Sequence, residues 1–273
     1  MQTASDAASK VSGFAPVNGL RMYYESVGEG DPLIFISCAL SACGLADLQE
    51  LPKRWRVIQM DLQGHGRTRD IDRPLSIEQH ARDVSTLLEH LKIEKAHILG
   101  WSYGGLIAMH LALMRPDLVN KVATYGSILG SPGDAIRLEV MGPPQQPSPQ
   151  GEAHRFQRDY YEKVAPDPGH WPEIWRKVIE LAPTGLTADQ LASIKHRVLV
   201  SLGDNDFIRL EHAIAAYRSL PNAELAVVPD ATHFLLFEAP WRFERIAARF
   251  FSEPTQQTPK ATIASGYQPG KWR

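Results

Sequence analysis

Long hydrophobic runs are missing from this chain of 273 residues. No stretch of about 18 consecutive apolar residues occurs, so the sequence contains no candidate membrane-spanning helix. The first ten residues are polar or small and lack the apolar centre of a secretory signal. We therefore expect a cytoplasmic protein that does not associate with membranes.

Cysteine is also scarce, with only Cys38 and Cys43, five positions apart. Two such thiols provide no disulfide framework, and no group of Cys and His residues has the spacing of a zinc site. Basic residues show no excess, because 29 Lys and Arg oppose 31 Asp and Glu, for a formal net charge of −2. We expect no metal, no other cofactor and no nucleic-acid partner.

Short apolar segments alternate with longer helical patterns along most of the chain, which predicts an α/β fold with a mostly parallel, doubly wound sheet. Residues 22–27 are expected to form an antiparallel edge strand before this alternation begins. Helices are expected at about 76–91, 103–114, 209–220 and 241–251. The buried strands of the predicted sheet are 33–37, 57–61, 97–101, 122–125, 198–202 and 225–229.

The alternation stops between residues 132 and 186. This segment is rich in proline and glutamine at first and then contains two helical patterns, near 152–164 and 171–181. We interpret it as a helical lid inserted into a core formed by residues 1–131 and 187–273, of which about 254–273 form a polar tail. A long loop without a role is the alternative, although long insertions in compact domains are usually functional or disordered.

The sequence Gly-Trp-Ser-Tyr-Gly at residues 100–104 lies where a predicted strand ends and a helix begins. This pattern, G-x-S-x-G, places a serine on a tight turn that exposes its hydroxyl, and glycine avoids collisions on both sides. The following helix directs its free amides and its positive dipole end toward the serine, which favours a developing oxyanion. Ser102 is therefore the candidate nucleophile.

A serine hydroxyl needs a base to remove its proton, and the base needs a carboxylate to orient it. His233 follows the last predicted strand, at the carboxyl edge where site residues gather in parallel sheets. The acid is expected in the loop after the preceding strand, where Asp206 is the candidate and Asp204 its competitor. His80 lies within a helical pattern and is interpreted as a surface or packing residue.

From about residue 21 to residue 251 the chain resembles the α/β-hydrolase superfamily. The resemblance is carried by the serine turn, by the glycine-containing loop at 61–68, by the G-x-x-D pattern at 203–206 and by the segment 233–240. It implies a triad of Ser102, His233 and Asp206, and a lid at 132–186.

One departure from this family concerns the oxyanion hole. Where the family usually has His-Gly, this chain has Ser37-Cys38, followed by Ala39. The resemblance implies that the backbone amides of Ala39 and Tyr103 bind the oxyanion. Cys38 replaces a glycine whose backbone freedom exceeds that of other residues, so we expect a reshaped loop. A nucleophilic role for Cys38 is the minor alternative, because no base partner is evident.

Small-molecule acyl substrates fit this chemistry best, and we predict a hydrolase of small carboxylic esters. Lactones, thioesters and the carbon–carbon bond of a diketone-like substrate are alternatives, and a ligand-binding protein on a hydrolase scaffold is the alternative from another class. The sequence does not indicate an oligomeric state. The residues predicted to form an apolar substrate pocket, rather than only to pack the lid, are Trp101, Met141, Phe156, Trp171 and Trp175.

Overall fold

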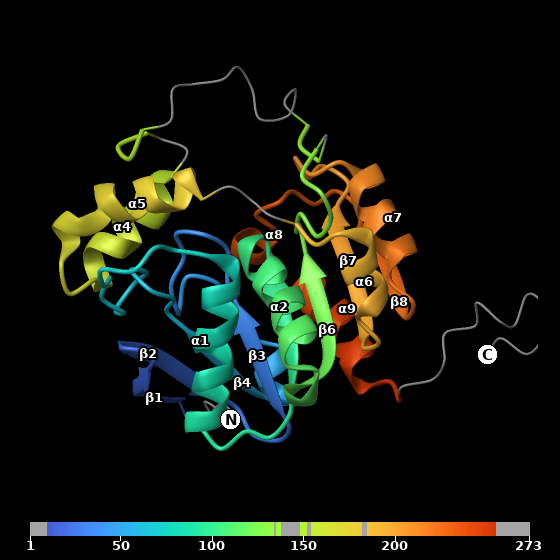
Figure 1. Ribbon diagram of the computed structural model, residues 1–273, viewed down its shortest axis with the longest axis horizontal. Helices are drawn as coiled ribbons and strands as arrows, with labels where there is room; N and C mark the ends of the chain where they lie inside the picture. Colours follow the sequence, from blue (N-terminus) through green and yellow to red (C-terminus); the bar gives the residue numbers. More distant parts are fainter. Residues whose placement is uncertain (1–9, 134, 138–147, 152–153, 182–184, 255–273) are drawn as a thin grey trace, which may run out of the picture.

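An eight-stranded sheet forms the centre of the protein (Figure 1). The computed structural model describes residues 10–133, 135–137, 148–151, 154–181 and 185–254. The sheet order is β1-β2-β4-β3-β5-β6-β7-β8, and the six strands from β4 to β8 in this order run parallel. The strands are β1 (Lys10–Val17), β2 (Leu20–Val27), β3 (Pro32–Ile36), β4 (Arg56–Met60), β5 (Ala96–Trp101), β6 (Val119–Tyr125), β7 (Arg197–Gly203) and β8 (Ala223–Val228).

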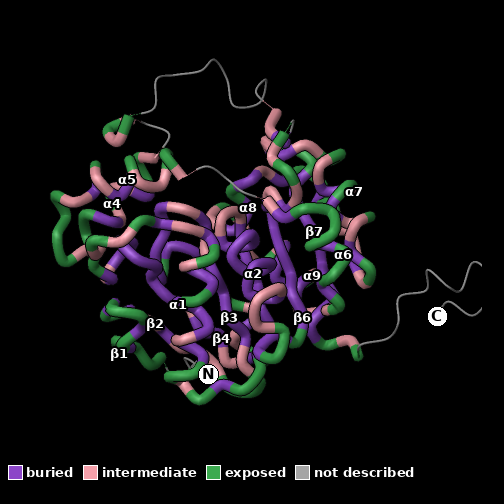
Figure 2. The backbone as a smooth tube through the Cα atoms, in the orientation of Figure 1, coloured by how far each residue is buried: buried purple, intermediate pink, exposed green. Residues whose placement is uncertain are grey.

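Helices cover both faces of the sheet, as the apolar alternation predicts. On one face pack α1 (Ile77–His90), α2 (Tyr103–Met114), α6 (Ala188–Ser193) and α7 (Leu210–Ser219), within a single apolar cluster. The other face is covered by α8 (Leu235–Glu238), α9 (Pro240–Ser252) and the 3-10 helix η1 (Leu51–Lys53). Figure 2 shows the central strands and α2 as almost continuously buried chain. A functional site is therefore expected at the carboxyl ends of the strands.

The N-terminal part of the sheet corrects one prediction. The strand at residues 22–27 is antiparallel, as expected, but it is not an edge strand, because β2 pairs with both β1 and β4. The edge is β1, which the sequence pattern does not reveal. Gly13 and Pro16 interrupt its apolar pattern, and an edge strand tolerates proline because one side of its backbone needs no partner.

The inserted segment folds, in its described part, as α4 (Arg155–Val164), a 3-10 helix η4 (Pro168–His170) and α5 (Trp171–Glu180). Figure 1 shows α4 and α5 side by side beyond the end of α1. Their apolar sides form a small separate cluster with Leu40 and Leu75 of the core. None of the described helices combines the length and the hydropathy that a membrane span requires.

Candidate active site

Ser102 occupies a sharp turn between β5 and α2. Its φ is 54°, in the left-handed region that non-glycine residues rarely adopt. A Cβ on Gly104 would lie 2.0 Å from the carbonyl oxygen of Ile36, and one on Gly100 would lie 2.4 Å from that of Gly104. Glycine is therefore required on both sides of the serine by backbone packing, as the motif predicts.

Three side chains that are distant in the sequence meet at this turn. His233 Nε2 lies 2.9 Å from Ser102 Oγ, and His233 Nδ1 lies 2.9 Å from Asp206 Oδ1. The same carboxylate oxygen accepts the backbone N–H of Ile208 at 2.9 Å, which holds the carboxylate in place. Asp206 is fully buried and His233 nearly so, at 4% exposure, so water screens the contact between the carboxylate and the imidazole only weakly.

Asp204, the competing acid, has a different task. Its Oδ1 accepts the backbone N–H of Ala231 at 3.1 Å, which ties the acid loop to the loop that carries His233. Backbone hydrogen bonds from Asp230 and Ala231 lower the pKa of Asp204. The structure thus brings Asp206, and not Asp204, to the histidine.

Trp101 contacts the backbone of His233 and does not line the cavity beside Ser102. This corrects the prediction that Trp101 forms part of the substrate pocket. Its side chain is fully buried, and its indole N–H donates to the carbonyl oxygen of His233 at 3.0 Å. Phe207, the residue after the acid, packs on the imidazole with ring centres 4.0 Å apart. Both contacts restrict the position of the histidine.

A cavity of about 200 Å³ opens next to Ser102. It is almost entirely apolar, and its only side chains with a polar group, among the described residues, are Ser102 and Tyr103. Val178 and Leu181, at the end of α5, supply part of its wall, so the inserted segment contributes to it. The other lining residues are Ala39, Ile77, Leu106, Gly126, Ile128, Phe207 and Ile208.

The other predicted pocket residues lie elsewhere. Trp171 and Trp175 are buried in the cluster that packs the inserted segment onto the core, and Phe156 is 57% exposed with its ring against Phe237. None of these three lines the cavity beside Ser102. Met141 lies outside the described residues.

The expected oxyanion donors, Ala39 and Tyr103, both line the cavity. Tyr103 is the first residue of α2, where backbone amides have no partner within the helix. In the loop after β3, which contains Ala39, the residue with left-handed backbone is Leu40, with φ 58°, and not Cys38. A glycine at residue 38 is therefore not needed for this loop shape. Burial raises the pKa of Cys38 to about 12, which keeps the thiol protonated and unreactive.

His80, interpreted from the sequence as a surface or packing residue, is fully buried beside the site. Its Nδ1 lies 2.8 Å from the hydroxyl oxygen of Tyr103. Burial lowers the pKa of His80 to about 3, so the ring is neutral near pH 7. The only signal in the sequence is its spacing from Ile77, because residues i and i+3 share one helix face.

Asp70 attaches the inserted segment to the core. Its carboxylate lies 2.6 Å from Lys177 Nζ and 3.1 Å from His170 Nε2, and it accepts a hydrogen bond from Gln63 Nε2 at 2.8 Å. Burial acts to raise the pKa of Asp70, but these hydrogen bonds outweigh it and lower the pKa. The described residues include no group of three or more His, Cys, Asp or Glu side chains suited to a metal ion.

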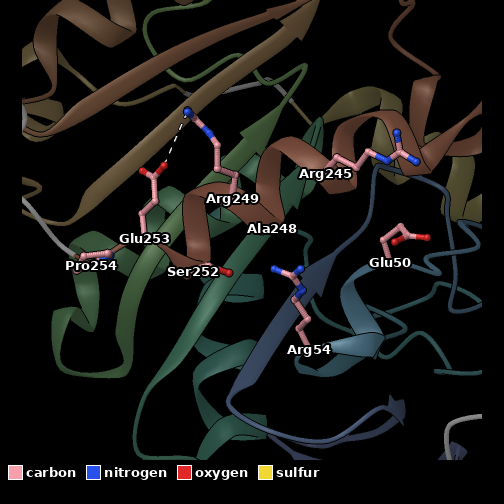
Figure 3. A pocket seen from close by; sticks show the side chains of 8 residues that line it. All are labelled: Glu50, Arg54, Arg245, Ala248, Arg249, Ser252, Glu253 and Pro254. Atoms are coloured by element: carbon pink, nitrogen blue, oxygen red, sulfur yellow. Dashed lines mark ion pairs between the residues drawn. The ribbon is translucent and has the colours of Figure 1, made fainter. Parts of the chain in front are cut away.

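A second hollow, of about 510 Å³, lies along α9, and none of its residues lines the cavity beside Ser102. Arg54, Arg245 and Arg249 border it, but Figure 3 shows their guanidinium groups pointing in different directions. Arg249 also pairs with Glu253 at 3.7 Å. The three cations therefore do not converge on one ligand position.

Comparisons with known proteins agree with this fold. The chain is 24% identical to human "Serine hydrolase BPHL" over 90% of this chain and 88% of the human protein. It is 28% identical to the 2-hydroxy-6-oxo-6-phenylhexa-2,4-dienoate hydrolase of Burkholderia cepacia over 72% and 77% of the two chains. A solved structure described as "Est816 as an N-Acyl homoserine lactone degrading enzyme" is 26% identical, with a TM-score of 0.69 over 87% of this chain and 99% of that one. A model of the alpha/beta hydrolase family matches residues 33–244, and the chain therefore belongs to this family.

Proposed function

We propose that this protein is a serine hydrolase that cleaves a small carboxylic ester through an acyl-enzyme intermediate on Ser102. The observation that carries the proposal is the hydrogen-bonded series from Ser102 Oγ through His233 to Asp206, with both distances at 2.9 Å. This geometry suits proton transfer from the hydroxyl to the imidazole without further movement.

In the proposed first step, Ser102 Oγ attacks the ester carbonyl while His233 Nε2 takes the hydroxyl proton. Asp206 accepts a hydrogen bond from the N–H at His233 Nδ1 and stabilises the charged ring. The imidazolium then protonates the leaving alcohol oxygen as the carbon–oxygen bond breaks. Water, deprotonated by His233, then attacks the acyl group. The bond between the acyl carbon and Ser102 Oγ breaks, His233 returns the proton to Oγ, and the acid is released.

The amides of Ala39 and Tyr103 are the proposed donors to the oxyanion. Both residues line the cavity beside Ser102, and Tyr103 adds the N-terminal end of the 12-residue helix α2. Donors of this kind stabilise charge that develops in the transition state, and losing one typically costs on the order of 100- to 1000-fold in rate.

The cavity favours an uncharged acyl substrate. It has no cationic side chain among the described residues, and a carboxylate buried without a partner is strongly disfavoured. This argues against substrates such as the dienoate in the name of the Burkholderia cepacia relative. Its volume of about 200 Å³ is below the roughly 300–1,000 Å³ of common ligand pockets, which favours a short chain.

A lactone is the second candidate substrate. The observation in its favour is the 26% identity to the structure described as an N-acyl homoserine lactone degrading enzyme. A lactone is a cyclic ester, so the same serine chemistry opens it, and the ring oxygen becomes the leaving group. The reaction steps are the same for an open-chain ester and a lactone, and the two candidates differ only in the shape of the molecule that the apolar cavity must accept.

Fluorophosphonate labelling combined with p-nitrophenyl ester and acyl homoserine lactone hydrolysis tests the proposal. We expect the wild type to be labelled and to cleave short esters or lactones, and Ser102→Ala to lose labelling and on the order of 10⁶-fold in turnover. Ser193→Ala is the matched control, because Ser193 is exposed on α6 and its hydroxyl donates to the Gln190 carbonyl within the same helix.

The other outcomes contradict the proposal in distinct ways. Labelling of Ser102 without turnover of any ester or lactone would indicate that this site cleaves another kind of bond, such as a carbon–carbon bond. Failure of the label to react would instead indicate a ligand-binding protein on a hydrolase scaffold. Turnover by Ser102→Ala above a tenth of the wild-type rate would remove Ser102 as the nucleophile.

A further inference from the structure

Tyr103 lines the cavity beside Ser102 and, with Ser102, is one of its two described residues whose side chains carry a hydroxyl. The role of the Tyr103 hydroxyl is separate from that of the Tyr103 amide, because the hydroxyl is held by α1 rather than by the serine turn. Ile77 lines the cavity, and His80, one turn later on α1, lies 2.8 Å from the tyrosine oxygen. The face of α1 that provides an apolar wall therefore also holds the hydroxyl.

The ring of His80 has one clear partner and one unpaired nitrogen. Nδ1 contacts the Tyr103 hydroxyl, whereas Nε2 is buried without a hydrogen-bond partner among the described residues. Because the ring is neutral, one nitrogen carries the proton and the other carries a lone pair. A buried N–H without an acceptor is rarer in proteins than an unpaired acceptor. The proton is therefore assigned to Nδ1.

The neighbouring His65 has the same arrangement. Its Nδ1 lies 2.9 Å from the carbonyl oxygen of Gln63, which can only accept, so Nδ1 carries the proton. Its Nε2 is likewise buried without a partner in the described part of the chain. The two rings meet edge to face, with centres 6.4 Å apart. Two unpaired acceptors thus lie in this region.

This tautomer determines what Tyr103 can do. With its proton on Nδ1, His80 donates to the tyrosine oxygen, and the hydroxyl hydrogen of Tyr103 is not used by His80. The remaining described side chains that line the cavity are apolar, except for Ser102, which bonds to His233. The hydrogen of the Tyr103 hydroxyl therefore has no acceptor among the described side chains that line the cavity.

We propose that Tyr103 is a specificity-determining residue whose hydroxyl donates a hydrogen bond to an oxygen in the part of the substrate that fills the cavity. His80 is the positioning residue that keeps the donor turned toward the substrate. The substrate class is an uncharged ester or lactone with an ether or oxo oxygen in addition to the reacting carbonyl. This inference rests on the proposed function, and it adds discrimination against plain alkyl esters, since a site built for a hydrogen bond rejects ligands that lack the acceptor.

Binding of unreacted esters tests this role without requiring turnover. In the Ser102→Ala background, Kd is measured by calorimetry for ethyl hexanoate and for three analogues with an ether oxygen in place of the methylene at carbon 3, 4 or 5. The readout is the Kd ratio of each analogue to hexanoate, compared between Tyr103 and Tyr103→Phe. A single hydrogen bond predicts a change of roughly 2- to 12-fold in this ratio for at least one analogue.

Tyr161→Phe is the matched control, because it removes a tyrosine hydroxyl from the packing cluster of the inserted segment, and Tyr161 does not itself line the cavity. It should leave every ratio unchanged. Ratios that are identical for Tyr103 and Tyr103→Phe across all three analogues would overturn the proposal. Failure of the ester hydrolase function would appear separately, as absent turnover by the protein with Ser102 intact.

The protonation of His80 provides a second, independent measurement on the unmodified protein. Long-range proton–nitrogen NMR spectra distinguish the two neutral tautomers of histidine, and His80→Gln identifies the signals that belong to residue 80. We expect the proton on Nδ1 near pH 7. A proton on Nε2 would make Tyr103 the donor to His80 and would overturn the inference.

Discussion

Gly126 is the position at which one methyl group should separate the candidate triad while leaving the fold in place. It follows β6 with φ 55°, and a Cβ there would lie 2.8 Å from both Asp206 Oδ2 and His233 Nδ1. Ordinary contacts begin at 3.4 Å, so Gly126→Ala forces a shift of about 0.6 Å between groups that now hydrogen bond. The left-handed backbone adds a further cost of roughly 1–2 kcal/mol in stability.

These two effects predict different readouts. The backbone cost should lower the melting temperature by roughly 2–8 °C, given about 2–4 °C per kcal/mol for a chain of this size. The shift should lower kcat/KM for a p-nitrophenyl ester on the order of 10- to 100-fold, because a displacement of about 1 Å can cost 100-fold. Fluorophosphonate labelling should slow in parallel, since it also depends on the serine and the histidine.

Two further glycines separate the causes. Gly19→Ala introduces the same kind of backbone strain, with φ 85°, but its nearest neighbour, Ile71, is at an ordinary 3.8 Å. It should lose stability and keep activity. A Cβ at Gly133 would meet no described atom within 4 Å, so Gly133→Ala should change neither stability nor activity. The reasoning would be refuted if Gly126→Ala kept more than half of the wild-type kcat/KM, or if Gly19→Ala lost as much activity.

Two further predictions concern buried groups that do not line the cavity. Cys38 and Cys43 are buried, and burial raises the pKa of both thiols. At pH 8 we therefore expect no thiol of the native protein to react rapidly with a disulfide reagent, and two to react after denaturation. A rapid reaction in the native state would contradict their burial. Burial lowers the pKa of His97 to about 4, below the value of about 6.5 in the unfolded chain. Between about pH 6.5 and about pH 4 the unfolded state therefore binds more protons than the folded state. The free energy of unfolding should fall as the pH is lowered through this window. His97→Gln should reduce that loss by at most about 1.4 kcal/mol per pH unit in chemical denaturation, and equal slopes for both proteins would exclude His97 as a source.

The predictable part of the site is local. Gly100 is required by a contact within the tight turn itself, with the Gly104 carbonyl oxygen, whereas Gly104 is required by the neighbouring strand β3. The G-x-S-x-G pattern nevertheless identifies the turn from the local sequence. The alternation of strands and helices then predicts that the ends of β7 and β8 approach this turn, because parallel strands present their carboxyl ends at one edge. For that reason Ser102, Asp206 and His233 could be expected to meet.

The cavity wall was decided by tertiary structure. Aromatic residues of the inserted segment were expected around the substrate, yet Trp171 and Trp175 pack that segment onto the core, and smaller aliphatic side chains line the cavity. An apolar pattern reports that a side chain is buried but not which surface buries it. The contact between His80 and Tyr103 could not be predicted for the same reason. A histidine on the apolar face of a helix has the same spacing whether it only packs or positions a tyrosine hydroxyl. Sequence alone therefore determined the nucleophile turn and the order of the elements, whereas the choice of neighbours across elements, and with it the shape and polarity of the cavity, required the folded chain.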